Sequence, residues 1–239
     1  MGDSSVTIAA ALVLWGCWIV PVLLLALALK LTRQTELDWR WFAAAAVAYG
    51  IYMLVGFSTL PANLRSLPDE ARWSSRLFQI AATATMMALV WNRHPLLTAK
   101  GMGLTLRQNP GSIPWSLLGM AALTVAGMIR NGVDPALTKL PANWLGWAYH
   151  AVLPGLEAEP IYRGLMLSLF AVTLGGTKKA IGWGAVMSTM VFSLGHGFYP
   201  NNGGIGIDLH MMIYAAMAGT ILGAMRLRSG SVLFGIIGH

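Results

Sequence analysis

The sequence predicts an all-α polytopic membrane protein, with about eight transmembrane helices around an intramembrane polar cavity. Of its 239 residues, 56% are hydrophobic and only 10% are charged, whereas soluble domains carry about 25% charged residues. The ionisable residues also fall at the ends of apolar segments, except for a cluster in residues 157–163. A spanning helix needs roughly 20 residues, so the length suits a single transmembrane domain over residues 1–239.

The remaining totals exclude other classes. The net charge of +7 does not indicate a nucleic-acid-binding protein, because the basic residues form small clusters at the ends of apolar segments, as membrane topology requires. Cys17 is the only cysteine, which excludes an intrachain disulfide and a cysteine metal cluster. No basic region precedes Cys17, so we interpret the first apolar run as a spanning helix rather than a cleaved signal peptide.

The first four predicted helices are bounded by basic residues, interfacial tryptophans or proline, all of which favour the end of an apolar span. Their ranges are 6–29, 42–60, 77–91 and 115–129.

The second half contains shorter apolar segments. An aromatic segment over 143–153 is interrupted by Pro154, and a new helix is predicted from Ala158 to Leu174, because proline at position 160 is tolerated in a first turn. Two further helices are predicted over 180–196 and 209–225, with a loop over 197–208 between them. A last apolar segment opens at Ser231 and reaches about half the length that a span needs, so we expect the natural chain to continue beyond His239.

The distribution of Lys and Arg predicts that the N-terminus of this multi-pass protein lies outside. We expect the membrane to be a bacterial or archaeal inner membrane. That orientation puts ten basic residues in inner loops and five in outer loops. The inner set is Lys30, Arg33, Arg40, Arg93, Lys100, Arg107, Lys178, Lys179, Arg226 and Arg228.

Glu159 and Arg163 are the first candidate site residues, because ionisable groups at membrane depth are costly and default to a functional hypothesis. Their four-residue spacing places them on one helical face, with Glu on the favourable N-terminal side. A predicted helix start near Ala158 also puts Glu159 in a first turn, where the helix dipole favours an anion. The alternative is that the pair only neutralises itself and braces the helix.

Two histidines are the next candidates. His196 has glycine on both sides and ends a helix that is predicted to lie antiparallel to the Glu159 helix, which places both side chains toward the same face at similar depth. A carboxylate and a histidine at matched depth could hold a water and remove its proton. His239 lies eleven residues after Arg228, about 16 Å along a helix, and therefore inside the bilayer.

These residues resemble the motifs of the CPBP family of intramembrane proteases, which contains the CAAX prenyl endopeptidases, the Abi proteins and the myxosortase-like sorting proteases. The family's first motif is Glu-Glu-x-x-x-Arg, and residues 159–163 match it from the second Glu onward. Residues 192–196 match the second motif, Phe-x-x-x-His, in full. Residues 231–239 are similar to the approach to the third motif, a histidine. The resemblance covers about residues 144–239.

Ala158 is the main departure, because the resemblance implies a glutamate there that activates water together with His196. Glu157 is not expected to replace it, since one helical residue turns a side chain by about 100°. The chain is then either an introduced Glu→Ala inactive variant, which the otherwise preserved motif favours, or a natural pseudoprotease. The resemblance further implies that His239 stabilises the oxyanion and that Glu159 and Arg163 position the base.

The resulting expectation is a glutamic-type intramembrane endopeptidase that needs no cofactor and cleaves a membrane-anchored protein or peptide tail entering from the lipid bilayer. The charge count puts the site near the outer face, which favours a sorting protease over the processing of cytosolic prenylated tails. Two alternatives stay open. Glu159, His196 and His239 could ligate zinc in a metalloprotease, or the chain is a non-catalytic membrane regulator. A transporter would show repeated halves, and none is found.

Overall fold

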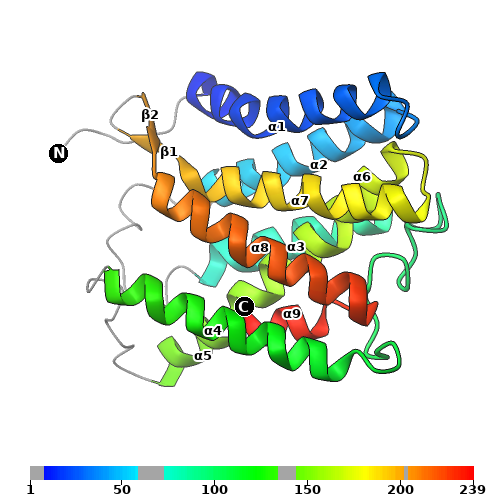
Figure 1. Ribbon diagram of the computed structural model, residues 1–239. Coiled ribbons are helices and arrows are strands. Elements are labelled where there is room, and N and C mark those ends of the chain that lie inside the picture. The colour runs from blue at the N-terminus through cyan, green and yellow to red at the C-terminus, as the bar shows by residue number, and fades with distance from the viewer. Residues whose placement is uncertain (1–7, 59–72, 134–143, 202–203) are drawn as a thin grey trace.

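The computed structural model describes residues 8–58, 73–133, 144–201 and 204–239. These residues form a bundle of helices with one small hairpin (Figure 1). The elements are α1 (Ile8–Leu31), α2 (Trp39–Ser58), α3 (Trp73–Val90), α4 (Ile113–Val133), α5 (Trp144–Glu159), η4 (Pro160–Met166), α6 (Leu167–Thr173), α7 (Lys178–Gly197), β1 (Phe198–Asn201), β2 (Gly204–Ile207), α8 (Leu209–Ser229) and α9 (Leu233–Gly238). The predicted helix start at Val6 and helix end at Leu60 lie outside the described residues.

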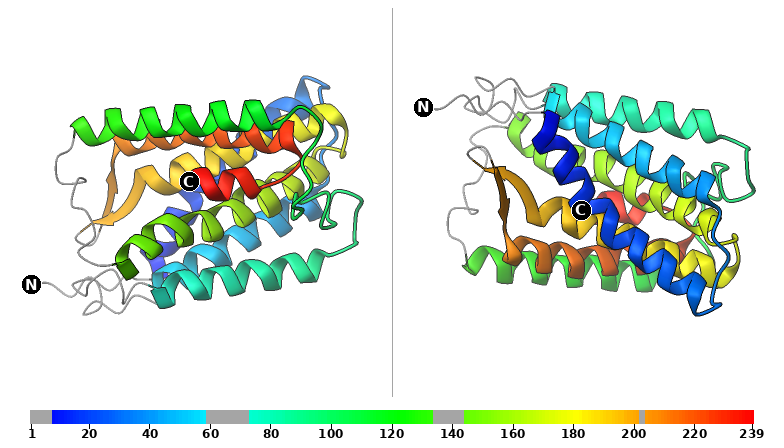
Figure 2. Two further views of the ribbon diagram at one scale, coloured as in Figure 1. Left: turned by 90° about the horizontal axis from the view of Figure 1, so that it is seen from below. Right: turned by 90° about the horizontal axis from the view of Figure 1, so that it is seen from above.

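Helix α7 occupies the middle of the bundle. It packs against α8 on one side, α6 on another and α1 on a third, while α4 covers α8. Helix α5 packs against both α3 and α9, so the short α9 lies inside the bundle between α5 and α4 (Figure 2). The elements that carry the sequence motifs therefore meet in the interior.

The exterior of this bundle is apolar. Exposed side chains on α1 include Leu12, Val20 and Leu24, and α4 exposes Leu118 and Met128. Monomeric soluble proteins rarely expose contiguous apolar surface on this scale. Within the described residues, the stretches 12–31 and 113–130 are long and apolar enough to cross a membrane. The count of eight transmembrane helices stays a prediction.

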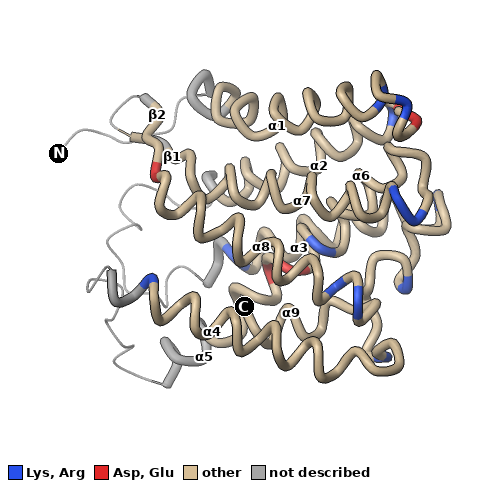
Figure 3. Tube along the Cα trace, viewed as in Figure 1, with Lys and Arg blue, Asp and Glu red and all other residues tan. Residues whose placement is uncertain are grey.

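Basic residues gather at one end of the molecule. Figure 3 shows blue segments where α1 ends, α7 begins and α8 ends, with few at the opposite end of the described chain. This arrangement agrees with the sequence analysis, which placed ten of the Lys and Arg residues in one set of loops. Which side of the membrane that end faces stays a prediction.

The expected helix break at Pro154 and new start at Ala158 are wrong. Helix α5 contains Pro154, and it continues through η4 into α6, so Glu159 lies inside a long helix rather than in a first turn. The helix-dipole argument for Glu159 therefore fails. Pro160 has no N–H to donate and its ring crowds the preceding turn, and at this residue the helix widens into the π-helical segment η4. Such π-helical turns are rare and are frequent at functional sites.

Two further segments differ from expectation. The predicted loop over 197–208 contains the antiparallel hairpin β1–β2, in which Phe198 pairs with Ile207. The expected helical run from Arg228 to His239 is also wrong, because α8 ends at Ser229, Gly230 is left-handed, and the separate helix α9 covers only Leu233–Gly238. The hairpin was missed because its two strands are four residues each and show no extended alternation of apolar and polar residues.

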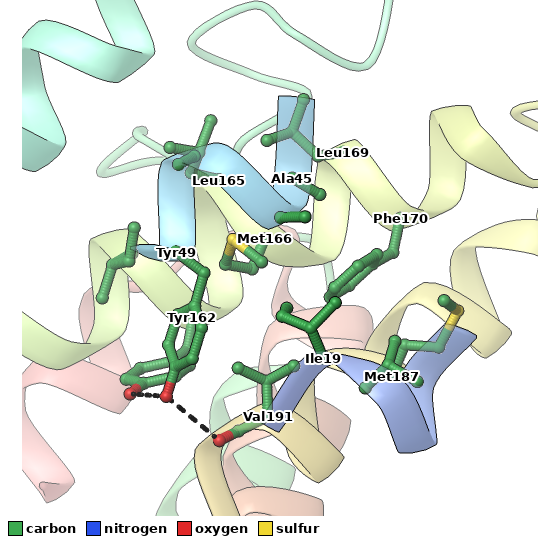
Figure 4. Packing of buried hydrophobic residues seen from close by; sticks show 14 of the residues in the cluster. Ile19, Ala45, Tyr49, Tyr162, Leu165, Met166, Leu169, Phe170, Met187 and Val191 are labelled. Atoms are coloured by element: carbon green, nitrogen blue, oxygen red, sulfur yellow. Dashed lines mark hydrogen bonds between the residues drawn. The ribbon is translucent and has the colours of Figure 1, made fainter. Parts of the chain in front are cut away.

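The apolar core contains one buried polar contact close to the motif residues. Figure 4 shows Tyr49 of α2 and Tyr162 of η4 among aliphatic side chains, with their hydroxyls 3.4 Å apart. The Tyr49 hydroxyl also donates to the carbonyl of Val191 in α7, at 3.4 Å. Buried tyrosine hydroxyls need hydrogen-bond partners, so this pair connects α2, η4 and α7 at a defined depth.

Candidate active site

Glu159 is the most deeply buried acidic residue of the site, with 1% of its side chain exposed. Its Oε1 lies 3.1 Å from Nδ1 of His239 and 3.6 Å from Nη1 of Arg163. A carboxylate out of contact with water needs compensating charge or hydrogen bonds. Arg163 on the same helix supplies the charge, and His239 at the end of α9 lies within hydrogen-bond distance. The Glu159 carboxylate therefore holds α9 against the centre of the bundle.

Phe192 of α7 is the common neighbour of the charged and histidine side chains. Its ring centroid is 4.3 Å from the guanidinium carbon of Arg163 and 4.4 Å from the ring centroid of His196. The His239 ring lies 6.1 Å away, nearly perpendicular to it. A guanidinium over an aromatic face is attracted by the ring quadrupole. Phe192 thus gathers Arg163, His196 and His239 around one buried ring.

His196 lies in the last turn of α7, where its ring nitrogen Nδ1 is 2.8 Å from the carbonyl oxygen of Phe192. A carbonyl oxygen only accepts hydrogen bonds, so Nδ1–H is the donor. In the neutral ring this leaves Nε2 with a free lone pair. His196 is exposed, so Nε2 is the ring nitrogen that could take a proton from water.

Ala158 marks the inward-facing side of α5. Leu156 and Val152, 38% and 47% exposed, lie one helical turn apart and define the outer face. Position 158 lies about 200° further around the helix than position 156, and Ala158 is 5% exposed within the apolar cluster that also contains Tyr162 and Phe192. A longer side chain at 158 would therefore extend into the bundle.

Glu157 adds a second buried carboxylate that pairs with Arg76 of α3. The exposed fraction of its side chain is 6%, whereas that of Arg76 is 31%. The ion pair ties α5 to α3 on the side opposite to the Glu159–His239 contact. It joins residues 81 positions apart, so no local spacing in the sequence could have indicated it.

Several polar atoms of the site have no hydrogen-bond partner among the described residues. They are Oε2 of Glu159 and both Nη atoms of Arg163, all buried. Buried polar groups without partners are costly and need a specific reason. Here the Arg163 guanidinium is compensated by the Glu159 charge and the Phe192 ring, which hold it without saturating its donors.

Glycine permits the close approach of α9. A Cβ at position 235 would stand 2.5 Å from Oε2 of Glu159 and 3.0 Å from its Cδ. On the other side of the contact, a Cβ at Gly155 would collide with the backbone of Ile236. The packing of α5 on α9 through these two glycines brings His239 to Glu159.

The structure thus brings Arg163, His196 and His239 together around Phe192. Glu159 contacts Arg163 and His239, and Ala158 lies on the inward-facing side of α5. Within residues 8–58, 73–133, 144–201 and 204–239, no three His, Cys, Asp or Glu side chains are grouped closely enough to hold a metal ion. Sequence reasoning overlooked Gly235, and it also overlooked that Phe192 connects the other residues. The four-residue step from Phe192 to His196 could have indicated the second point.

Comparison with known protein families gives a match in the second half of the chain. Residues 140–239 match the family model described as type II CAAX prenyl endopeptidase Rce1-like. The match covers every motif residue named above and supports the resemblance to the CPBP family, a family of membrane-embedded proteases. The comparisons with curated proteins and with solved structures gave no match.

Proposed function

We propose that this chain has the scaffold of a glutamic-type intramembrane endopeptidase, which hydrolyses a peptide bond in a membrane-anchored protein or peptide tail. The observation that carries the proposal is the contact of Arg163, His196 and His239 with Phe192, and of Glu159 with Arg163 and His239, inside an apolar bundle. The Rce1-like match over residues 140–239 supports the same class of reaction.

The geometry supports a separate catalytic role for each group of the site. A carboxylate at position 158 and Nε2 of His196 would hold a water and take its proton as it attacks the peptide carbonyl carbon. When protonated, His239 donates from Nδ1 to Glu159 and from Nε2 to the developing oxyanion, a contribution of about 3–4 kcal/mol per donor in other hydrolases. Glu159 and Arg163 keep His239 and Phe192 in place.

Ala158 removes the carboxylate from the inward-facing position, so we expect the chain to hydrolyse its substrate far more slowly than an Ala158→Glu variant. General-base catalysis contributes about 100-fold to 10,000-fold. The test is cleavage in liposomes of two quenched-fluorescent substrates. One ends in a farnesylated Cys-aliphatic-aliphatic-x tail, and the other carries a single apolar membrane anchor. Cleavage of either by Ala158→Glu, abolished by adding His196→Ala, is the expected result.

A non-catalytic regulator is the second candidate, favoured by one observation: an alanine occupies the inward-facing position of an otherwise preserved motif. It predicts that Ala158→Glu cleaves neither substrate while the unaltered chain co-purifies with a membrane protein. That result would overturn the protease proposal.

A further inference from the structure

A groove with a volume of about 420 Å³ lies between α4 and α8, two helices that run side by side (Figure 1, Figure 2). Its lining includes the exposed residues Leu118, Ala122 and Ala224, together with the buried Met225. Gly119 lets α4 approach α8 closely, because a Cβ at this position would stand 2.5 Å from the Met225 sulfur. This part of the α4–α8 groove therefore offers an apolar surface that suits a hydrocarbon chain.

One end of the α4–α8 groove carries a cation. Among the described residues that line it, only Arg228 is charged. Arg228 lies in the last turn of α8, and its guanidinium carbon is 5.4 Å from the centroid of the Trp115 ring in the first turn of α4. The residue is exposed, and no carboxylate of the described residues forms an ion pair with it. The apolar groove thus ends at a guanidinium that is accessible to a ligand.

The depth of the α4–α8 groove corresponds to one membrane leaflet. Helix α4 contains the candidate span 113–130, and exposed tryptophans at the end of a span are typical of the membrane interface. Trp115 and Arg228 therefore lie at the level of the lipid headgroups. Ala122 follows Trp115 by seven positions, which is about 10 Å along a helix, whereas the hydrocarbon of one leaflet is about 15 Å thick. The groove runs from the headgroups into the acyl chains of the same leaflet.

The surroundings of Arg228 determine which headgroup charge fits. The preceding loop is held against this end of α8, because the backbone N–H of Asn109 donates to the Ser229 carbonyl at 2.8 Å and its side-chain amide donates to the Arg228 carbonyl at 3.1 Å. That loop carries a second exposed cation, Arg107, and Figure 3 shows further basic segments at the same end. A negatively charged headgroup is attracted by such a cluster, whereas the ammonium group of a zwitterionic headgroup is repelled.

We propose that the α4–α8 groove binds an anionic phospholipid, with one acyl chain along the groove and the phosphate at Arg228. The guanidinium suits this role, because its planar set of N–H donors can hold two oxygens of one phosphate. The inference is independent of the proposed function, since none of the candidate active-site residues lines the groove.

A purely structural Arg228 would behave differently. A cation in the last turn of a helix stabilises that helix by itself, through the helix dipole. Its loss would then lower the stability of the protein in lipid-free detergent and leave the affinity for phospholipid unchanged. A lipid site predicts the reverse dependence, a loss of affinity that is specific to anionic lipid.

The experiment titrates the chain in detergent with two phospholipids that have the same dioleoyl chains, phosphatidylglycerol and phosphatidylcholine, and measures bound lipid by native mass spectrometry. Phosphatidylglycerol should bind at least about fivefold more tightly, the factor expected for one arginine beside an anionic headgroup. Arg228→Met should remove this preference, and Arg228→Lys, which retains a cation, should keep part of it. Arg93→Met is the matched control, because Arg93 is exposed in the loop between α3 and α4 and does not line the groove.

A second pair of variants tests the position of the acyl chain. Ala122→Phe fills the groove without changing its charge and should lose most of the phosphatidylglycerol binding. Ala121→Phe is its control, since Ala121 is also exposed on α4 but does not line the groove. Thermal unfolding in lipid-free detergent verifies that each variant is folded, and Ala122→Leu replaces Ala122→Phe if the larger side chain prevents folding.

Three results would overturn the proposal. Equal affinities of the unaltered chain for the two lipids would exclude selection of an anionic headgroup. Equal losses from Arg228→Met and Arg93→Met would show a diffuse attraction to the basic end instead of a site. Unchanged binding by the Ala122 variant, or displacement of the lipid by glycerol 3-phosphate at the same concentration, would show a phosphate site that does not involve the groove.

Discussion

The Nδ1 atom of His239 lies 3.1 Å from Oε1 of Glu159, a contact between residues 80 positions apart in the chain. It joins the short α9 to the centre of the helix formed by α5, η4 and α6. The same Glu159 oxygen lies 3.6 Å from Nη1 of Arg163. One buried carboxylate oxygen thus links two of the motif segments, and the first three predictions concern the residues around it.

Replacing His196 with alanine in the Ala158→Glu background should lower kcat by about 100-fold to 10,000-fold, the contribution of a positioned acid–base group. The reason is that Nδ1–H donates to the Phe192 carbonyl, which leaves Nε2 as the ring nitrogen that can take a proton from water. His196→Gln, whose amide nitrogen cannot act as a base, should be as slow as alanine. The measurement is initial cleavage rate in liposomes. A rate within threefold of the parent would exclude His196 from proton transfer.

Arg163→Met should lower the free energy of unfolding by about 3–5 kcal/mol, because the buried Glu159 charge loses its guanidinium partner. Arg163→Lys should recover part of this loss, since it restores charge without the planar group over Phe192. The measurement is denaturant unfolding in detergent micelles. Arg228→Met is the control. Arg228 is exposed, its guanidinium lies 5.4 Å from the Trp115 ring centroid, and its loss should cost about 0.5–1 kcal/mol. Equal losses for both would contradict the prediction.

Gly235→Ala should displace the Glu159 carboxylate, because the added Cβ would stand 2.5 Å from Oε2. We expect a loss of about 1–3 kcal/mol in stability, as for other overpacked sites, and a lower cleavage rate in the Ala158→Glu background. Gly182→Ala in α7 is the matched control, since nothing lies within 4 Å of its Cβ. It should be neutral or stabilising by up to about 1 kcal/mol. A Gly235→Ala protein as stable and active as the control would refute the close contact.

Asp38 gives a pH prediction outside the helices. The hydrogen bonds from the Arg40 side chain and backbone hold the pKa of the Asp38 carboxyl below its usual range. A lowered folded-state pKa contributes stability at neutral pH, and this contribution is lost as the pH falls through that lowered pKa. Asp38→Asn keeps a capping oxygen without the charge. It should unfold at a lower temperature than the parent at pH 7, with the gap closing under acid conditions. A gap that is independent of pH would show that the charge has no part in it.

The helical class of the fold and the pairing of Glu159 with Arg163 could be predicted because both follow from local spacing. Apolar runs of helical length predict the helical class, and the four-residue spacing predicts that Glu159 and Arg163 lie on one helical face. The continuity of α5 through Pro154 could not be predicted, because the local tendency of proline to break a helix is overridden by the packing of Gly155 on α9. That contact joins distant parts of the sequence.

The candidate site, too, could be predicted from the sequence only in part. The residue types at 159, 163, 196 and 239 were visible in the sequence, while their convergence on Phe192 depends on how α7 packs beside η4. The ion pair of Glu157 with Arg76 was invisible for the same reason. Helical geometry alone placed Glu157 away from the cavity, and the structure shows that its carboxylate nonetheless stays inside the protein.

The contact between Glu159 and His239 also sets an order of events during biosynthesis. Helix α9 leaves the ribosome after α1 to α8, and the N-terminal parts of a chain fold first during synthesis. While the earlier helices insert, the buried carboxylate has Arg163 beside it but no histidine partner from α9. In a nascent chain the candidate site therefore stays incomplete until translation has passed residue 239.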